Sequence, residues 1–179
     1  GGNDYVRSAL GAQYACQSAM QNIQEFVHQT DAASLRHESD RLLRELESSI
    51  ITTWNALIRL HYDTHPFSTE ELAQVSAKAR QKYQDGRIES AYGTTLIAAA
   101  VTADYWFAVQ IGDGKCVAVT QEGQFGQPIP PNDRCFLHAT TSICDADALD
   151  NFRHRFSEKL PVAVFVGSDG VDDCFKNKE

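Results

Sequence analysis

Residues 161–173 read Pro161-Val-Ala-Val-Phe-Val-Gly-Ser-Asp-Gly-Val-Asp-Asp173, and the interpretation of the whole chain depends on this stretch. A short apolar run bounded by Pro and Gly is typical of a strand that is buried on both faces. Asp169, Asp172 and Asp173 follow it, and carboxylates so close together repel one another unless a cation lies among them. The same residues also suit a helix start, with Ser168 or Asp169 as the N-cap. The stretch by itself leaves both interpretations open.

The length and composition are those of an ordinary globular protein. The chain has 179 residues, of which 42% are hydrophobic and 22% are charged, and its formal net charge is -8. At this length a single domain covering residues 1–179 is expected. The negative charge argues against a nucleic-acid-binding protein, which would normally present a basic face. An acidic chain is compatible with a metal site built from carboxylates, although solubility alone would also explain the charge.

The cysteines favour a reducing compartment. The chain has five of them, widely spaced and without a C-x-x-C pair: Cys16, Cys116, Cys135, Cys144 and Cys174. This pattern fits free thiols better than a disulfide framework or a zinc ribbon. No apolar run is long enough to span a bilayer and no signal peptide is visible. A cytoplasmic protein without membrane contact is therefore expected, and nothing in the pattern predicts its oligomeric state.

The first half of the chain is predicted to be helical. Apolar residues recur at intervals of three and four over residues 7–30 and 33–62, which indicates two amphipathic helices. A third helix is expected over residues 68–83, because Ser68 and Glu71 have the spacing of a capping box.

Strands are predicted in the second half. Residues 93–102, 105–111 and 116–120 are β-prone apolar runs, and residues 121–134 contain the Gly and Pro of a surface loop. Asp145 is expected to cap a further helix that carries Leu149, Phe152, Phe156 and Leu160 on one side. Hairpin connections between the strands predict an α+β fold, in which helices pack on an antiparallel sheet.

Asp113 is a candidate metal ligand in the turn Gly112-Asp113-Gly114. Asp-Gly is also the commonest structural choice for a hairpin turn, and for Asp113 alone that explanation is favoured. If this turn and the end of the 161–167 strand lie at the same edge, Asp113, Asp169 and Asp173 converge. Hard divalent cations such as Mg²⁺ and Mn²⁺ take oxygen ligands of this kind.

Three motifs in order resemble those of type 2C metal-dependent Ser/Thr protein phosphatases, the PPM family. They are Gly93-Thr94-Thr95, Gln110-Ile111-Gly112-Asp113-Gly114 and Gly167-Ser168-Asp169-Gly170-Val171-Asp172-Asp173. The resemblance implies a layered αββα fold, in which an antiparallel β-sandwich is flanked by helices on both outer faces. It also implies that residues from 121 to about 140 correspond to the variable flap region beside the active site.

The resemblance assigns roles to the three carboxylates. It implies that Asp169 is a ligand of the catalytic metal pair, and that Asp113 and Asp173 hold a third, more weakly bound metal. The implied function is hydrolysis of phosphomonoesters in a phosphoprotein substrate by a water that a binuclear Mn²⁺ or Mg²⁺ centre activates. No covalent phosphoenzyme is needed.

The resemblance also predicts what these 179 residues lack. In the family, the aspartate that bridges both metals would lie just before Gly1, and a further ligand would lie beyond Glu179. We therefore expect an incomplete sandwich and negligible phosphatase activity from this chain alone. The alternative function is a non-catalytic phosphatase-like module that binds a partner or has a regulatory role.

Overall fold

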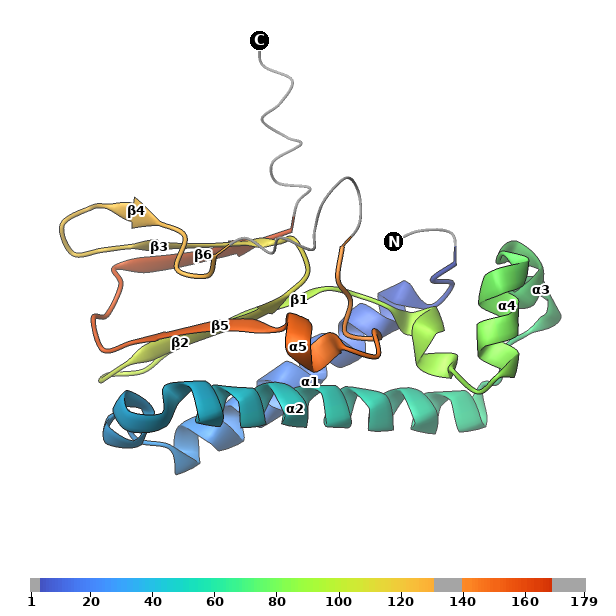
Figure 1. Cartoon of the computed structure of the whole chain (residues 1–179), viewed down its shortest axis with the longest axis horizontal. Coiled ribbons are helices and arrows are strands. Elements are labelled where there is room, and N and C mark those ends of the chain that lie inside the picture. Colours follow the sequence, from blue (N-terminus) through green and yellow to red (C-terminus); the bar gives the residue numbers. More distant parts are fainter. Residues whose placement is uncertain (1–3, 131–139, 169–179) are drawn as a thin grey trace, which may run out of the picture.

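The computed structural model describes residues 4–130 and 140–168. Its helices are α1 (Ser8–Gln29), α2 (Ala32–Thr64), α3 (Thr69–Gln74), α4 (Ala77–Gln84), the 3-10 helix η1 (Ile88–Tyr92) and α5 (Ala148–Asn151). Its strands are β1 (Leu96–Val101), β2 (Trp106–Ile111), β3 (Lys115–Val119), β4 (Phe125–Gly126), β5 (Arg153–Ser157) and β6 (Ala163–Gly167). Figure 1 shows these elements in layers, with α1 and α2 beneath two stacked sheets.

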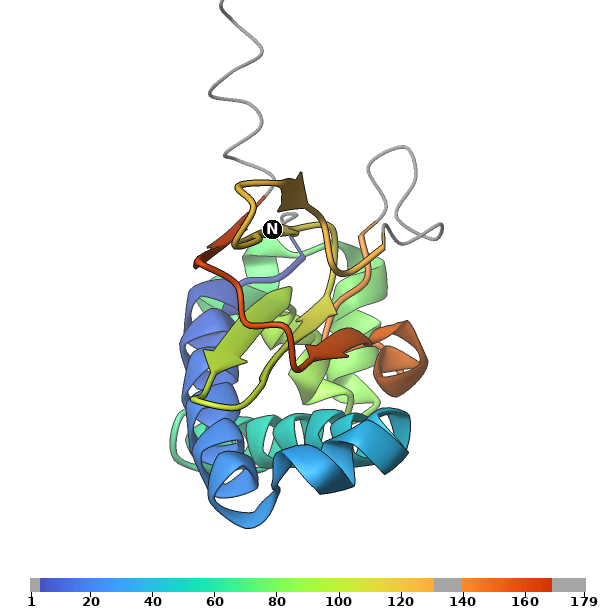
Figure 2. The ribbon, with the colours of Figure 1, turned by 90° about the vertical axis from the view of Figure 1, so that its left-hand side faces the viewer.

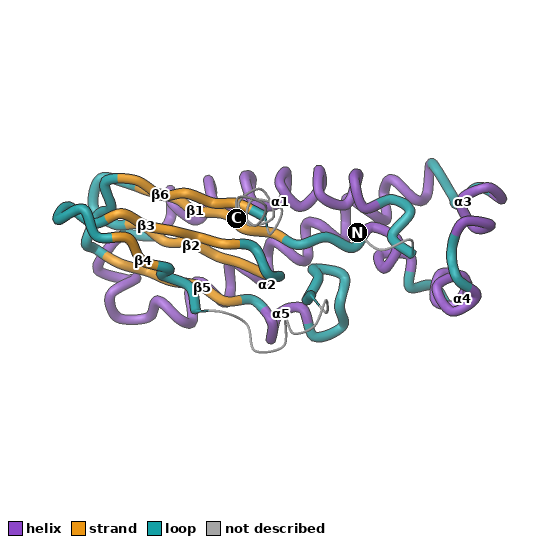
Figure 3. The backbone as a smooth tube through the Cα atoms, turned by 90° about the horizontal axis from the view of Figure 1, so that it is seen from above, coloured by secondary structure: helices purple, strands orange, loops and turns teal. Residues whose placement is uncertain are grey.

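The strands form two antiparallel sheets, one in the order β1-β2-β5 and the other in the order β4-β3-β6. Seen from above, β6, β3 and β4 lie over β1, β2 and β5 (Figure 3). The predicted α+β fold with antiparallel sheets is confirmed. Within the described residues, helices cover only the outer face of the β1-β2-β5 sheet, as Figure 2 shows from the end of the stack.

Strand β2 is the centre of the fold, and all of its residues are buried. Its side chains alternate between the two faces of the sheet, as they must in a strand. Phe107, Val109 and Ile111 face the helices and join the larger core. Trp106 and Ala108 face the second sheet and join a smaller core with Cys116 and Ile129. This explains why residues 106–111 are apolar apart from Gln110.

The connection between β2 and β3 is not a hairpin, which corrects the sequence-based prediction. The two strands do not pair: β2 pairs with β1 and β5, and β3 pairs with β4 and β6. The turn at residues 112–114 therefore carries the chain from one sheet to the other. The strand β3 pairs with β6 at Lys115 and Gly167, so the turn lies beside the end of β6.

The predicted helix with Asp145 as its cap is also wrong except for one turn. Helix α5 begins only at Ala148, and the Asp145 carboxylate accepts from the Ser142 amide instead of capping that helix. Helix α5 ends at Asn151, and residues 153–157 pair with β2 as strand β5. Leu149, Phe152 and Phe156 have helical spacing. The side chains of residues 153–157 also fit a strand, in which His154 and Phe156 lie on one face and Arg155 on the other. The backbone groups along the edge of β2 supply hydrogen bonds that a surface helix would leave unused, and this decides the outcome.

The other helices follow the prediction, with one interruption. Helices α1 and α2 match residues 7–30 and 33–62. The third predicted helix has its capping box at Ser68, but it divides into α3 and α4. Val75 and Ser76 are extended at the break, and Ser76 caps α4. The amide and the hydroxyl of Ser76 both donate hydrogen bonds to the Asp4 carboxylate. Buried Val75 enters the core at this point.

Two further boundaries differ from the prediction. The strand expected over 93–102 begins only at Leu96, after η1 and an extended segment. The loop expected over 121–134 contains the short strand β4, and its residues 131–134 lie outside the described part. Over residues 4–130 and 140–168, no helix combines the length and the apolar character needed to cross a membrane.

Candidate functional site

Asp113 is exposed at the turn where the chain passes from the first sheet to the second. The neighbouring Gly114 packs so closely on β6 that a Cβ there would lie 2.9 Å from the carbonyl oxygen of Gly167. The Asp113 turn therefore lies against Gly167 and Ser168, the last described residues of the stretch 161–173. Asp169 and Asp173, the other two predicted ligands, lie outside the described residues.

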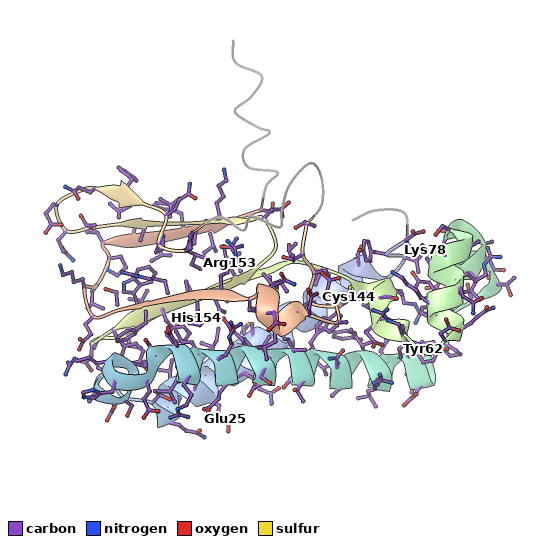
Figure 4. The ribbon with its side chains drawn as sticks, in the orientation of Figure 1. Glu25, Tyr62, Lys78, Cys144, Arg153 and His154 are labelled. Carbon is purple, nitrogen blue, oxygen red and sulfur yellow. The ribbon has the colours of Figure 1, made fainter. Side chains whose placement is uncertain are left out.

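Three polar residues hold the Asp113 turn. The buried Gln110 amide donates to the carbonyls of Gly112 and Gly114. Arg153 donates to the Gly112 carbonyl at 2.6 Å and also to the Pro130 carbonyl. The Gly112 amide donates to Thr141 Oγ1 at 3.1 Å. Figure 4 shows Arg153 between the two sheets.

Sequence reasoning did not assign a role to these three residues. The role of Gln110 could have been predicted, because it is a polar residue in an otherwise apolar buried strand, and buried polar groups are nearly always hydrogen-bonded. The roles of Arg153 and Thr141 could not have been predicted, since they depend on a strand and a loop that meet the turn only in the folded structure.

A cavity of about 420 Å³ opens beside Asp113. Hydroxyl groups dominate its polar lining, which comprises Tyr5, Ser8, Thr94, Thr95, Asp113, Thr140 and Ser142. The first turn of α1 also lines it through Ser8 and Ala9, and that turn contains no acidic residue. The amino end of a long helix carries a partial positive charge and favours anions. The helix end therefore favours an anionic group such as a phosphate at its side of the cavity, whereas the Asp113 carboxylate in the lining repels an anion unless a cation lies between them.

The protonation state of the lining favours hydrogen-bond donation. Burial raises the pKa of Tyr5, and the nearby Cys144 and Asp145 raise it further, so the phenol remains protonated. Burial also raises the pKa of the Cys144 thiol, whose sulfur lies 3.2 Å from Ser142 Oγ. Cys144 is therefore a packed thiol beside the cavity and a poor nucleophile.

The described residues supply only part of a metal site. Asp113 offers an exposed carboxylate of the oxygen type that Mg²⁺ and Mn²⁺ accept. Across residues 4–130 and 140–168, no group of three or more His, Cys, Asp or Glu side chains is arranged to hold a metal ion. Asp113 fits such an ion as one ligand of a set whose other predicted members lie outside the described part.

The layered antiparallel fold, with the Thr94–Thr95 segment, the Asp113 turn and the end of β6 at one end of the sheets, has the features of a type 2C phosphatase domain. The family model for protein phosphatase 2C matches residues 4–179, and the chain belongs to this family. The resemblance seen in the three sequence motifs is thereby confirmed. Comparisons with curated proteins and with solved structures gave no match.

Proposed function

We propose that the chain belongs to a Mn²⁺- or Mg²⁺-dependent protein serine/threonine phosphatase domain that acts on a phosphoprotein in the cytoplasm. Membership of the protein phosphatase 2C family, matched over residues 4–179, is the observation that carries this proposal. The position of the Asp113 turn against Gly167 and Ser168 supports it, because Asp169 follows Ser168 directly in the chain. The three free thiols among the described residues are compatible with a reducing compartment.

The residues of the Asp113 turn and of the cavity beside it each have a role in this proposal. Asp113, Asp169 and Asp173 would hold the metal ions by carboxylate oxygens. The metal pair would supply an activated water and would offset the charge of the phosphate. The amino end of α1 would favour the phosphate in the 420 Å³ cavity, and the hydroxyl of Tyr5 would donate a hydrogen bond. Gln110 and Arg153 would keep the Asp113 turn in place.

The test is hydrolysis of a phosphothreonine peptide by the natural protein that contains this chain, measured with and without Mn²⁺. Asp169→Asn should lower kcat/KM by about 100-fold or more, because a lost core ligand removes several kcal/mol of transition-state stabilisation. Asp113→Asn should leave activity at saturating Mn²⁺ closer to normal and raise the Mn²⁺ concentration that is needed. Hydrolysis that does not depend on metal would contradict the proposal.

Asp104→Asn is the matched control, because Asp104 is also an exposed turn aspartate but lies at the opposite end of β2. It should leave both activity and Mn²⁺ requirement unchanged. A protein that binds the phosphopeptide but does not hydrolyse it at any Mn²⁺ concentration would support the alternative, a non-catalytic phosphatase-like module.

A further inference from the structure

A second cavity lies away from the Asp113 turn, where the two sheets part at their β4 and β5 edges. It has a volume of about 900 Å³, and strands, turns and the segment after β5 all contribute to its wall. Figure 3 shows β4 above β5 along this side of the molecule. We call it the edge groove, and we define it by Trp106, Ala118, Phe125, Arg155, Lys159 and Leu160.

The edge groove is bordered by two strands, β4 and β5, each of which has one edge without a neighbouring described strand. Within the described residues, β5 pairs only with β2, and β4 pairs only with β3. The five-residue strand β5 therefore presents a row of backbone N–H and C=O groups that no neighbouring described strand satisfies, whereas β4 has only two residues. Such an edge is a template for an added extended segment, and proteins that bind peptides by strand addition use it in this way.

Arg155 supplies the charge of the edge groove. It pairs with Ala108 in the register of β2 and β5, so it shares the face of the sheet that looks toward the second sheet. Its exposed guanidinium has no hydrogen-bond or ion-pair partner among residues 4–130 and 140–168. Lys159 adds a second positive charge, which Glu122 on the opposite wall partly offsets. A positive groove with one unpaired guanidinium complements a carboxylate.

The apolar part of the edge groove lies toward Ser157 and the segment that follows it. The indole of Trp106 is fixed there, because its Nε1 donates to the Lys159 carbonyl at 3.0 Å. Leu160 packs against the same small core, and Phe125 on the rim is 76% exposed. Ser157 lies two residues beyond Arg155, and therefore on the same face of β5. An apolar side chain two positions from the carboxylate would meet this region.

We infer that the edge groove binds an extended acidic segment of a partner protein, in which a Glu or Asp and an apolar residue lie two positions apart. The segment adds a strand to the free edge of β5, its carboxylate meets Arg155, and its apolar side chain lies over Trp106. Strand β3 separates the 120–124 turn of the groove from the Asp113 turn, and its five residues span about 17 Å. The partner therefore leaves the Asp113 cavity open.

The test is fluorescence anisotropy with labelled peptides and the natural protein that contains this chain. The probes are Ser-Thr-Glu-Thr-Val-Thr-Ser and the reverse order Ser-Thr-Val-Thr-Glu-Thr-Ser, since the strand can add in either direction. One of these two peptides should bind to the protein, and it should do so with or without Mn²⁺. Arg155→Glu should weaken binding about tenfold or more, as should replacing the Glu of the peptide by Lys. The Lys peptide should regain affinity for the Arg155→Glu variant.

Lys78→Glu is the matched control, because Lys78 is an exposed cation on α4, far from the edge groove (Figure 4). It should change the affinity less than twofold, and Arg155→Gln serves in place of Arg155→Glu if that variant does not fold. Hydrogen exchange should slow at residues 153–157 on binding and stay unchanged at residues 112–114. Equal affinity for the Glu and Lys peptides, no binding by either order, or a requirement for Mn²⁺ would overturn the inference.

Discussion

His154 on β5 lies 2.9 Å, measured from its Nδ1, from Oε1 of Glu47 on α2, a carboxylate with no exposed surface. Its Nε2 lies 3.4 Å from Oδ1 of Asp40, about two turns before Glu47 on α2. Arg44 also contacts Glu47, at 3.5 Å. The His154–Glu47 pair connects helix α2 to the edge of the β1-β2-β5 sheet. Figure 4 shows His154 on the helix side of β5.

The first prediction concerns the pH dependence of stability. The hydrogen bond to Glu47 is the main reason that the pKa of His154 is raised, and it outweighs the opposing effect of burial. The folded protein therefore holds the His154 proton more tightly than the unfolded chain does. This stabilisation is complete below about pH 6.5, the ordinary histidine pKa, and is lost as the pH rises through the raised folded pKa.

Urea unfolding of the protein and of His154→Gln should therefore give a larger difference in free energy of unfolding at pH 6 than at pH 9. His37→Gln is the control, because His37 is exposed on the same helix and should give no such difference. A His154→Gln effect that is the same at both pH values would show that the charge of His154 contributes nothing.

The second prediction concerns Arg7, which is buried where α1, α2, α3 and η1 meet. Its guanidinium donates to both oxygens of Glu71, at 2.7 and 2.8 Å, to Tyr92 and to the carbonyls of His65 and Pro66. A lysine cannot reproduce this planar set of donors. Arg7→Lys should lower the free energy of unfolding by about 2–4 kcal/mol, measured by urea denaturation.

Arg59→Lys is the control for Arg7→Lys. Arg59 is exposed on α2 and lies 3.8 Å from Glu89, so the exchange should cost less than about 0.5 kcal/mol. Equal losses from the two substitutions would contradict a special role for the Arg7 hydrogen bonds.

The third prediction concerns Gly112, in the turn that crosses between the sheets. Its φ is +100°, and a Cβ there would lie 2.3 Å from Cγ2 of Thr95. Gly123 has a φ of +76° but open space around it. Gly123→Ala should cost about 1 kcal/mol through backbone strain alone. Gly112→Ala should cost at least about 2 kcal/mol, because overpacking adds to the strain, and thermal unfolding of both variants measures the difference.

The fourth prediction concerns the thiols. Cys16 is exposed, whereas Cys116 and Cys144 are buried and burial raises the pKa of both. Of these three thiols in the described part, a thiol-specific reagent at pH 7.5 should modify Cys16 before Cys116 and Cys144. The two buried thiols should react only at the rate at which the protein opens, because burial shields them and disfavours the reactive thiolate. Peptide mapping by mass spectrometry identifies the modified residue. Rapid modification of Cys144 in the folded protein would contradict its placement.

Local patterns predicted the elements whose form does not depend on distant neighbours. Helices α1 and α2 are long enough for three-and-four spacing to be decisive, and the Ser68–Glu71 capping box formed as its residues indicated. The predicted ligand Asp113 could be placed in a turn from Gly-Asp-Gly alone. The roles of Asp169 and Asp173 remain predictions, because both residues lie outside the described part.

Pairing between distant segments decided the rest. Phe152 and Phe156 satisfy both a helical and an alternating pattern, and only the free edge of β2 made their segment a strand. Likewise, Gly112-Asp113-Gly114 reads as a hairpin turn, yet its flanking strands belong to different sheets.

The sequence by itself determined the family, the antiparallel α+β class and the carboxylates worth testing, because these follow from local motifs and their order. Only the tertiary structure brought the Asp113 turn against the end of β6, set Gln110 and Arg153 beside that turn, and placed Arg155 in the edge groove with no partner from the described part of the chain. The physical reason is that a strand's neighbours are chosen by hydrogen-bond pairing and burial across the whole chain, and not by the residues beside it in sequence.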